Sequence, residues 1–319
     1  MKSEGRDDAA AQRRPAAAAR SYRLAGQSVP AAPIAPGLHV VSTPIGNLGD
    51  VTLRALEVLA AADLVACEDT RVTHRLMERY AIATPLTPYH DHNAAAARPK
   101  LLARLAAGEA VALVSDAGTP LISDPGYRLV RAALAAGHAV IPVPGCSAVL
   151  AALAIAGVAT DRFFFEGFLP AKPAARQARI AELAAIPATL VVFETGPRIA
   201  AALADLAAAF GDREAAVCRE LTKLHEEVRR AGLATLARDY GAAARPRGEM
   251  VVVISGPREE PLAEAEIDAR LRAALAGSSV KDAVSTVAGT TGVSRRDVYR
   301  RALALAKDHD QGHDDDSAD

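Results

Sequence analysis

The sequence predicts an α/β protein with two α/β domains and a separate basic helical segment at its C-terminal end. From Leu38 onward, short β-branched runs alternate with Ala- and Leu-rich segments of helical period, the pattern of a parallel sheet covered on both faces. The pattern changes near Asp161, where Phe163-Phe-Phe165 begins a second alternating region. After Gly256-Pro257 the periodicity is helical only.

The first domain is expected to contain four strands and four helices in alternation. The strands are expected at 38–43, 63–67, 110–115 and 139–143, and the helices at 53–62, 71–80, 98–107 and 128–136. Gly108 and Gly137 stand where two of these helices should end. In the second domain, strands are expected from Phe163 and at 189–194, 214–221 and 249–255, with helices near 174–185 and 198–210.

Residues outside these regions are assigned by composition. Residues 1–36 are rich in Ala, Arg and Pro and lack the apolar core of a signal peptide. We predict a disordered extension whose removal leaves activity intact. Residues 308–319 contain six Asp and no Lys or Arg, typical of an acidic disordered tail. The expected organisation is an extension at 1–36, α/β domains at 37–159 and 160–257, a basic helical hairpin at 262–307, and the tail.

Overall composition limits the class of protein. The chain has 319 residues, of which 50% are hydrophobic, and a net charge of −1, so it can bury a sizeable core. Cys67, Cys146 and Cys218 stand far apart, which argues against a disulfide framework or zinc cluster and favours a reducing compartment. No apolar run approaches the roughly 18 residues of a membrane span. We therefore expect a cytoplasmic protein without a membrane partner.

Three loops rich in Pro and Gly follow strands of the first domain, at 42–50, 115–126 and 143–148. Such loops let the backbone approach a ligand closely, and ligands of parallel sheets bind at the carboxyl ends of the strands. We expect the three loops to converge on one cleft. The first loop is neither GxGxxG nor GxxxxGK[ST], which disfavours a usual dinucleotide fold and a P-loop NTPase. An ordinary turn with Asp50 or Thr52 as helix cap fits that loop equally well.

Two polar motifs lie between the second and third expected strands. Glu68-Asp-Thr-Arg71 could cap the next helix and form an ion pair, or could orient a nucleophile or bind phosphate. In His90-Asp-His-Asn93 the two imidazoles lie on one side of an extended segment, but without a further ligand at suitable spacing we expect no metal. In the second domain, Glu194, Arg198, Arg219, Glu220 and Lys223 form either structural ion pairs or a mixed-charge rim.

The C-terminal segment is the one strongly basic region. Between Ile267 and Lys307 it has eight basic and three acidic residues. The pattern predicts a helix, a turn at 289–292 and a second helix capped by Ser294. This resembles a helix-turn-helix, whose second helix meets nucleic acid, although a basic helical hairpin can also be a solvated face.

Seven strings, in this order, resemble the bacterial ribosomal small subunit methyltransferase I family of the tetrapyrrole methylase superfamily. They are Thr43-Pro-Ile-Gly-Asn-Leu48, Cys67-Glu-Asp-Thr-Arg71, His90-Asp-His-Asn93, Val114-Ser-Asp-Ala-Gly-Thr-Pro-Leu-Ile-Ser-Asp-Pro-Gly126, Phe165-Glu-Gly-Phe-Leu-Pro-Ala-Lys172, Arg219-Glu-Leu-Thr-Lys223 and Gly248-Glu-Met-Val251. The chain departs from the family pattern at Cys146, Pro197 and Arg247, where the family more often has Pro, His and Lys.

The resemblance implies a two-domain tetrapyrrole-methylase fold with S-adenosylmethionine in the cleft between the domains. It also implies a homodimer that methylates the ribose 2′-oxygen of cytidine 1402 in 16S rRNA, within the small ribosomal subunit and not on DNA. A porphyrinoid methyltransferase, a non-catalytic nucleic-acid-binding protein and a structural interaction protein are the alternatives, in that order. The first would not need the basic hairpin, the second would not need the three loops, and the third explains neither feature.

The resemblance and the expected cleft together assign roles to particular residues. Orientation of the nucleophile is assigned to Glu68, Asp69, Arg71 and His90. Cofactor contacts are assigned to Pro44, Gly46, Asp116, Gly118, Thr119, Ile122, Ser147 and Met250. RNA contacts are assigned to Lys223, Arg295, Arg296, Arg300 and Arg301, and no metal is expected.

Overall fold

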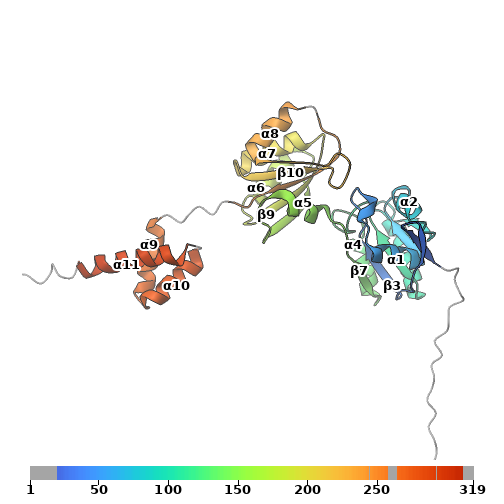
Figure 1. Cartoon of the computed structure of the whole chain (residues 1–319), viewed down its shortest axis with the longest axis horizontal. Helices are drawn as coiled ribbons and strands as arrows, with labels where there is room; N and C mark the ends of the chain where they lie inside the picture. The colour runs from blue at the N-terminus through green and yellow to red at the C-terminus, as the bar shows by residue number, and fades with distance from the viewer. Residues whose placement is uncertain (1–19, 244, 258–263, 292, 312–319) are drawn as a thin grey trace, which may run out of the picture. The chain divides into compact units, whose positions relative to one another are not determined.

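The structure, a computed structural model, describes residues 20–243, 245–257, 264–291 and 293–311. It contains two compact units, one ending at Pro257 and one beginning at Arg258, and each is described by itself (Figure 1). The expected disorder of residues 1–19 and of most of the acidic tail concerns positions outside the described residues.

The first α/β part contains a five-stranded, fully parallel sheet with the order β5-β4-β6-β3-β7. Its strands are β3 (Gly37–Val41), β4 (Leu64–Cys67), β5 (Leu86–Pro88), β6 (Ala110–Val114) and β7 (Val140–Val143). Four of them lie where the periodicity predicts strands. β5 was not predicted, because three residues are too few to show an alternating pattern.

Both faces of this sheet are covered, as predicted. Its helices are α1 (Leu53–Ala61), α2 (Thr70–Arg79), α3 (Ala94–Ala106) and α4 (Tyr127–Ala135). Side chains alternate along each strand, so Val65 packs with α1 and α2 on one face, while Leu64 and Ala66 pack with α3 and α4 on the other. Gly108 and Gly137 follow α3 and α4 with φ of 76° and 78°, the left-handed conformation expected at helix ends.

Part of the N-terminal extension belongs to the fold, so the exclusion of residues 1–36 was wrong for residues 20–36. β1 (Ser21–Leu24) and β2 (Gln27–Pro30) form an antiparallel hairpin. Ala25 and Gly26 form its turn with φ of 48° and 83°, the geometry of a tight hairpin. Tyr22 is buried against the α1 side of the sheet, and Arg20 pairs with Asp63 at 2.8 Å.

This hairpin changes the truncation prediction. Removing residues 1–19 is expected to leave the thermal midpoint within about 1 °C and the activity unchanged. Removing residues 1–36 exposes the apolar surface beneath Tyr22 and breaks the Arg20–Asp63 pair, which should cost about 2–4 kcal/mol. Thermal unfolding of the two truncated proteins beside the full chain measures this difference. Equal midpoints for the two truncations would contradict a structural role for the hairpin.

The second α/β part contains a mixed five-stranded sheet with the order β11-β10-β12-β9-β8. β8 and β9 are parallel and the other neighbours are antiparallel. The strands are β8 (Phe163–Phe168), β9 (Thr189–Thr195), β10 (Glu214–Arg219), β11 (Glu227–Gly232) and β12 (Glu249–Ile254). β11 was not predicted, since this edge strand has no buried residue to mark one face.

Two different sets of helices cover the second sheet. One face packs against α6 (Pro173–Leu183), α7 (Ile199–Phe210) and α8 (Leu233–Ala242). The other face packs against α5 (Ala148–Ala156), which follows directly from the first sheet. Ile45, in the loop after β3, belongs to the same apolar cluster as α5. The loop after β3 therefore contributes to the core on this face of the second sheet.

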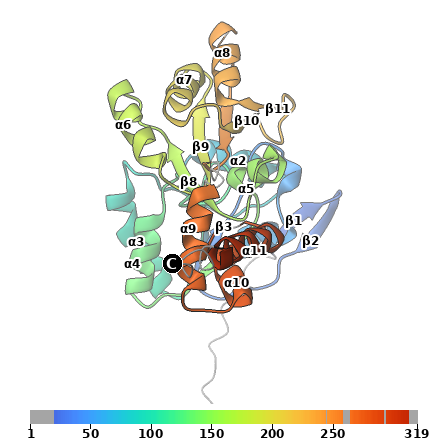
Figure 2. The same ribbon diagram turned by 90° about the vertical axis from the view of Figure 1, so that its left-hand side faces the viewer.

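The described part of the C-terminal unit contains three helices, α9 (Glu264–Leu275), α10 (Val280–Thr291) and α11 (Arg295–Gln311) (Figure 2). They enclose a core of their own that includes Leu271, Val287 and Val298. The turn predicted at 289–292 was wrong for residues 289–291, which lie inside α10, and residue 292 lies outside the described residues. Packing of neighbouring apolar residues outweighs the low helix propensity of Gly289. Ser294 caps α11, as predicted, by accepting a hydrogen bond from the Asp297 amide at 3.2 Å.

No helix in the described part of the chain combines the length and apolar character needed to cross a membrane.

Candidate active site

Three loops at the carboxyl edge of the first sheet are joined by hydrogen bonds. The Thr43 amide donates to the Gly118 carbonyl at 2.9 Å, and the Gly118 amide donates back at 3.0 Å. The hydroxyls of Ser42 and Thr119 are 2.9 Å apart, and Thr119 also donates to the Cys146 carbonyl at 3.1 Å. The loops that follow β3, β6 and β7 therefore converge, as the sequence predicts.

Three side chains of these motifs cap helices. Thr52 accepts a hydrogen bond from the Ala55 amide at 3.1 Å, which decides between Asp50 and Thr52 as the cap of α1. Asp69 caps α2 and Ser147 caps α5. The amino ends of α1, α2 and α5 lie at these motifs, where amides that the caps do not use can meet a ligand.

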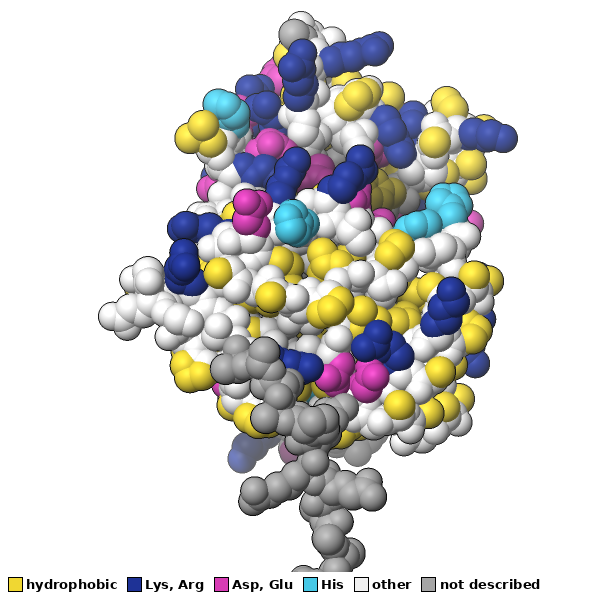
Figure 3. Space-filling view, turned by 90° about the vertical axis from the view of Figure 1, so that its right-hand side faces the viewer, with side chains coloured by type: hydrophobic (Ala, Val, Ile, Leu, Met, Phe, Trp, Pro, Cys, Tyr) yellow, Lys and Arg dark blue, Asp and Glu magenta, His cyan; other side chains and the backbone are white. Residues whose placement is uncertain are grey.

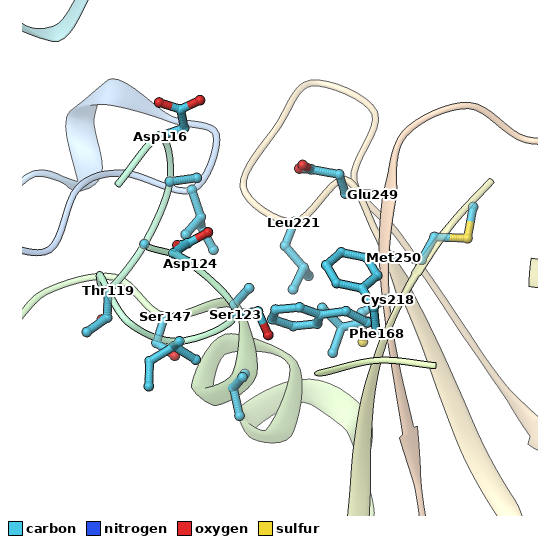
Figure 4. A pocket seen from close by; sticks show the side chains of 18 of the residues that line it. Asp116, Thr119, Ser123, Asp124, Ser147, Phe168, Cys218, Leu221, Glu249 and Met250 are labelled. Carbon is cyan, nitrogen blue, oxygen red and sulfur yellow. The ribbon is translucent and has the colours of Figure 1, made fainter. Parts of the chain in front are cut away.

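A cavity of about 290 Å³ lies between these loops and the strand ends of the second sheet (Figure 4). This volume is near the lower end of the range for small-molecule sites. Of the assigned residues, those that line the cavity are Glu68, Asp116, Gly118, Thr119, Ile122, Ser147, Lys223 and Met250. Those that do not are Pro44, Gly46, Asp69, Arg71 and His90.

Pro44 and Gly46 nevertheless border the site. They flank Ile45, which lines the cavity. A Cβ atom on Gly46 would overlap the Lys223 side chain and lie 3.0 Å from the Leu221 carbonyl oxygen. The absence of a side chain at this position therefore lets the β3 loop approach the loop after β10.

Met250 lines the cavity, but its side chain belongs to the core. Met250 packs with Val252 in the cluster covered by α6, α7 and α8, whereas Val251 packs with the cluster on the opposite face. The alternation of side chains along β12 explains this placement. Any ligand contact of Met250 is therefore made mainly by its backbone.

Several lining residues were missed by the sequence assignment. They are Ser123, Asp124, Phe168, Phe193, Leu221 and Glu249, most of which lie inside or beside the recognised strings. The Phe168 and Phe193 rings meet edge to face with centroids 5.6 Å apart. Figure 4 places Phe168 across the cavity from the loop that bears Asp116 and Thr119. The family-like sequence strings contain most of these lining residues, but only the fold brings the two phenyl rings opposite that loop.

The cavity is acidic, and partial burial raises the pKa of several of its carboxyl groups. Desolvation is the main cause at Glu68, Asp116, Asp124 and Glu194. It raises the pKa of Asp124 to about 6, with the negative charge of Asp116 adding to the effect. Perturbed carboxyl groups gathered in one cavity are typical of functional sites.

Lys223 is the one basic side chain that lines the cavity, and it is already paired. Its ammonium group lies 2.9 Å from Glu220 and 3.0 Å from Glu249. Arg198 similarly pairs with the buried Glu194 at 3.0 Å. The ion-pair interpretation therefore holds for these residues, and it weakens the assignment of Lys223 to RNA binding.

Backbone strain is concentrated at the rim of this cavity. Leu121, Ser123, Glu220 and Thr222 all have positive φ, between 50° and 75°. This conformation is unfavourable for residues with a side chain, and it persists where the surrounding structure enforces it. The loop after β6 and the loop after β10 are thus held in specific shapes around the cavity.

The residues assigned to the nucleophile separate into three places. Glu68 lines the cavity, whereas Asp69 pairs with Arg71 at 2.5 Å at the surface. Hydrogen bonds from the Arg71 side chain and backbone lower the pKa of Asp69 to about 2. His90 lies outside the cavity, and its backbone amide donates to Asn93 at 2.9 Å. No group of three or more potential metal ligands is found within the described ranges.

The four assigned arginines of α11 differ in their surroundings. Arg295, Arg296 and Arg300 are exposed, and Arg300 pairs with Asp297 at 2.8 Å. Arg301 is half-buried and pairs with Asp268 of α9 at 2.8 Å. Arg301 therefore joins helices within the unit, whereas the other three are exposed to a partner.

Two family models match the chain. "Tetrapyrrole (Corrin/Porphyrin) Methylases" matches residues 37–237, and "RsmI C-terminal HTH domain" matches residues 261–306.

Among curated proteins, the chain is similar to several named ribosomal RNA small subunit methyltransferase I. The one from Mesorhizobium japonicum is 50% identical over 292 residues, which is 91% of this chain and 99% of the relative. Those from Pseudomonas aeruginosa and Escherichia coli O157:H7 are 46% and 43% identical, cover 83% of this chain, and are themselves covered over 96% and 94%.

Solved structures share the fold at lower identity. The methyltransferase CobJ superposes with a TM-score of 0.54 at 20% identity, over 71% of this chain and 97% of that one. A conserved hypothetical protein from Aeropyrum pernix K1 superposes with a TM-score of 0.55 at 19% identity, over 86% and 98%.

Proposed function

The chain belongs to the tetrapyrrole methylase family and, within it, to the ribosomal RNA small subunit methyltransferase I family, and on this premise we propose that it transfers a methyl group from S-adenosylmethionine to the ribose 2′-oxygen of cytidine 1402 in 16S rRNA. The observation that carries the proposal is the acidic cavity bounded by three converging loops, in a chain whose helix α11 also begins with a cluster of exposed arginines.

The cavity fits the charge of S-adenosylmethionine. Its lining contains six carboxylates, those of Glu68, Asp116, Asp124, Glu194, Glu220 and Glu249, against the single Lys223. A ligand with a sulfonium and an ammonium group gains from such a field, because the charges attract in a partly desolvated site. The backbone of Gly118, Thr119 and Met250 and the apolar side chains of Ile122 and Phe168 would hold its neutral parts.

Methyl transfer places modest demands on the protein. Bound S-adenosylmethionine supplies an electrophilic methyl carbon, so the chain has mainly to align the acceptor and exclude water. A ribose hydroxyl is a weak nucleophile and gains from a nearby carboxylate that takes its proton. Glu68 lines the cavity and desolvation raises its pKa. We therefore retain Glu68 as a residue that orients the acceptor, whereas Asp69 and Arg71 support the start of α2.

Transfer of labelled methyl from S-adenosylmethionine to small ribosomal subunits that lack their native modifications tests this function. Ribose-specific digestion should place the label on the 2′-oxygen of one decoding-site cytidine. Cofactor binding without RNA labelling would contradict the proposal and favour a porphyrinoid acceptor. Absence of cofactor binding would contradict the role of the cavity.

The exposed face of α11 is the proposed RNA contact. Arg295, Arg296 and Arg300 lie on it together with Tyr299, which is 49% exposed. Arginines bind phosphates and an exposed aromatic ring can stack on an unpaired base. On the face drawn in Figure 3, by contrast, basic side chains stand among acidic and apolar ones without forming a single patch.

Replacing Arg295, Arg296 and Arg300 together by Gln is expected to weaken binding of small subunits by about 10–100-fold. The slope of log affinity against log salt should become shallower by about 2–3, since each phosphate contact contributes roughly 0.7–0.9. Filter binding at several salt concentrations measures both. The matched control is Arg301→Gln, which should lower the stability of the helical unit through loss of the Asp268 pair while leaving the salt slope unchanged. An equal slope change in both variants would contradict the assignment.

Membership of this family also suggests the oligomeric state of the protein and the form of its RNA substrate. We propose a cytoplasmic homodimer that acts on the assembled small subunit, supported by the family resemblance and by the basic α11 face. Light scattering of the purified full chain should give twice the mass of one chain, and 16S rRNA stripped of protein should be methylated more slowly than small subunits.

A further inference from the structure

A second cavity of about 110 Å³ adjoins the first on the first sheet. It is lined by Tyr89, Asp91, Ala94, Asp124, Pro125, Gly126, Tyr127 and Arg128. Asp124 lines both cavities and therefore lies at their junction. A molecule bound in the second cavity would thus have one of its groups beside the carboxylate that faces the first.

Two helices begin at this cavity, and neither has a side-chain cap. Ala94 is the first residue of α3, and Gly126 immediately precedes α4. Neither Asn93 nor Gly126 supplies a side-chain hydrogen bond to the first turn of its helix. The Ala94 amide of α3 donates to the His90 carbonyl at 2.9 Å, whereas the amide hydrogen bonds of α4, within the described residues, begin at Leu129. The amino end of α4 therefore keeps backbone amides available, and its partial positive charge favours an anionic group.

Side chains strengthen this preference. Arg128 lines the cavity at the start of α4, and Arg98 on α3 is close enough for its charge to act on Tyr89. Neither arginine forms an ion pair among the residues that the structure describes. Tyr89 is 1% exposed, and its hydroxyl has Arg98 as a polar neighbour but forms no hydrogen bond of ordinary geometry. A buried hydroxyl without a well-formed hydrogen bond is costly and can gain one from a ligand or water.

The mixed charge of the lining limits what the ligand can be. A free phosphate would meet Arg128 but would be repelled by Asp91 and Asp124, and a metal ion would be repelled by the arginine and by the helix amino ends. A nucleotide can contact both the basic and the acidic groups of the lining. Its phosphate is an anionic acceptor, and its ribose hydroxyl is a neutral donor. Tyr127, 60% exposed at the edge, offers a ring on which a base can stack.

We propose that the second cavity is the acceptor subsite, which receives the RNA nucleotide to be methylated, with its phosphate at Arg128 and the α4 amino end and its 2′-hydroxyl at Asp124. This inference rests on the proposed function and adds the position of the acceptor to it.

The step balances with the groups named. The ribose oxygen forms a bond to the methyl carbon while the bond between that carbon and the sulfonium sulfur breaks, and the electron pair stays on sulfur. The hydroxyl proton passes to the Asp124 carboxylate and from there to water. Asp124 serves as the proton acceptor because it lies between the acceptor subsite and the cavity assigned to the cofactor.

Arg128→Gln in the full chain tests the phosphate contact. We expect the KM for unmodified small subunits to rise about tenfold and the salt slope to become shallower by about one, with the Kd for S-adenosylmethionine within twofold of wild type. Tyr89→Phe removes only the unpartnered hydroxyl and should raise the KM by about three- to tenfold without lowering the thermal midpoint. The matched control is Lys100→Gln, an exposed cation on α3 outside the lining, which should change the KM by less than twofold.

The outcomes separate this inference from the proposed function. If wild type methylates the small subunit and Arg128→Gln behaves like Lys100→Gln, the acceptor subsite is wrong and the function stands. A Kd for S-adenosylmethionine that rises in parallel with the KM would also overturn the subsite, because the second cavity would then hold part of the cofactor. Failure of wild type to methylate RNA at all would overturn the proposed function itself.

Discussion

Asp124→Asn is expected to make the protein more stable at pH 7.5 and about a hundredfold slower in methyl transfer. Burial raises the pKa of Asp124 from 3.8 to about 6, so the folded state holds the proton more tightly than the unfolded state. Ionised Asp124 therefore lowers stability at every pH above about 6, and the cost disappears as the pH falls from 6 to below 4. Asparagine removes a cost of about 1–2 kcal/mol, after allowance for partial exposure, and it also removes the proton acceptor.

Urea unfolding at pH 7.5 and pH 4 measures the stability, and single-turnover methyl transfer measures the rate. The gain in stability should shrink at pH 4, where wild-type Asp124 is largely protonated. The wild-type rate should rise with pH through about 6, and this rise should vanish in the variant. Asp161→Asn, an exposed carboxylate outside both cavities, is the matched control and should alter neither quantity. A wild-type rate in Asp124→Asn would contradict its role as proton acceptor.

Gly46→Val is expected to weaken S-adenosylmethionine binding by about a hundredfold. A Cβ atom at this position would overlap the Lys223 side chain and lie 2.9 Å from the Thr222 hydroxyl and 3.0 Å from the Leu221 carbonyl oxygen. Relief of these contacts has to separate the β3 loop from the β10 loop, and both loops line the cavity through Ile45 and Leu221. Overpacking of this kind costs about 1–3 kcal/mol in stability.

Calorimetric titration with S-adenosylmethionine measures the loss, and circular dichroism confirms that the variant is folded. Gly49→Ala in the same loop is the control, since its Cβ would approach only the Asn47 side chain, and its affinity should stay within threefold of wild type. If Gly46→Val bound the cofactor as wild type does, the separation of these two loops would have no part in binding.

Local patterns predicted the elements that have a strong internal signal. The strands β3, β4 and β6 are mostly buried apolar runs, β7 is rich in β-branched residues, and the positive φ of Gly108 and Gly137 marks the helix ends. The elements that were missed or excluded are short or lie at edges. The β1–β2 hairpin has four residues in each strand and β5 has three, so their stability comes from packing against α1 and β4 rather than from their own sequence.

The candidate site shows the same division between local and distant interactions. The capping roles of Thr52, Asp69 and Ser147 and the pairing of Asp69 with Arg71 involve neighbours within three residues, so the sequence could suggest them. The pairing of Lys223 with Glu249 spans 26 residues. It depends on the alignment of β10 with β12, which no local pattern specifies.

By itself, the sequence determined the alternating α/β order, the converging Pro- and Gly-rich loops and the arginine-rich start of the last helix. These features depend on residue type and short-range spacing. Only the tertiary structure decided which strand ends face those loops, that Asp124 joins two cavities, and that Arg301 is used inside the helical unit. Desolvation and ion pairing depend on what covers a group in space, and segments distant in sequence supply that covering.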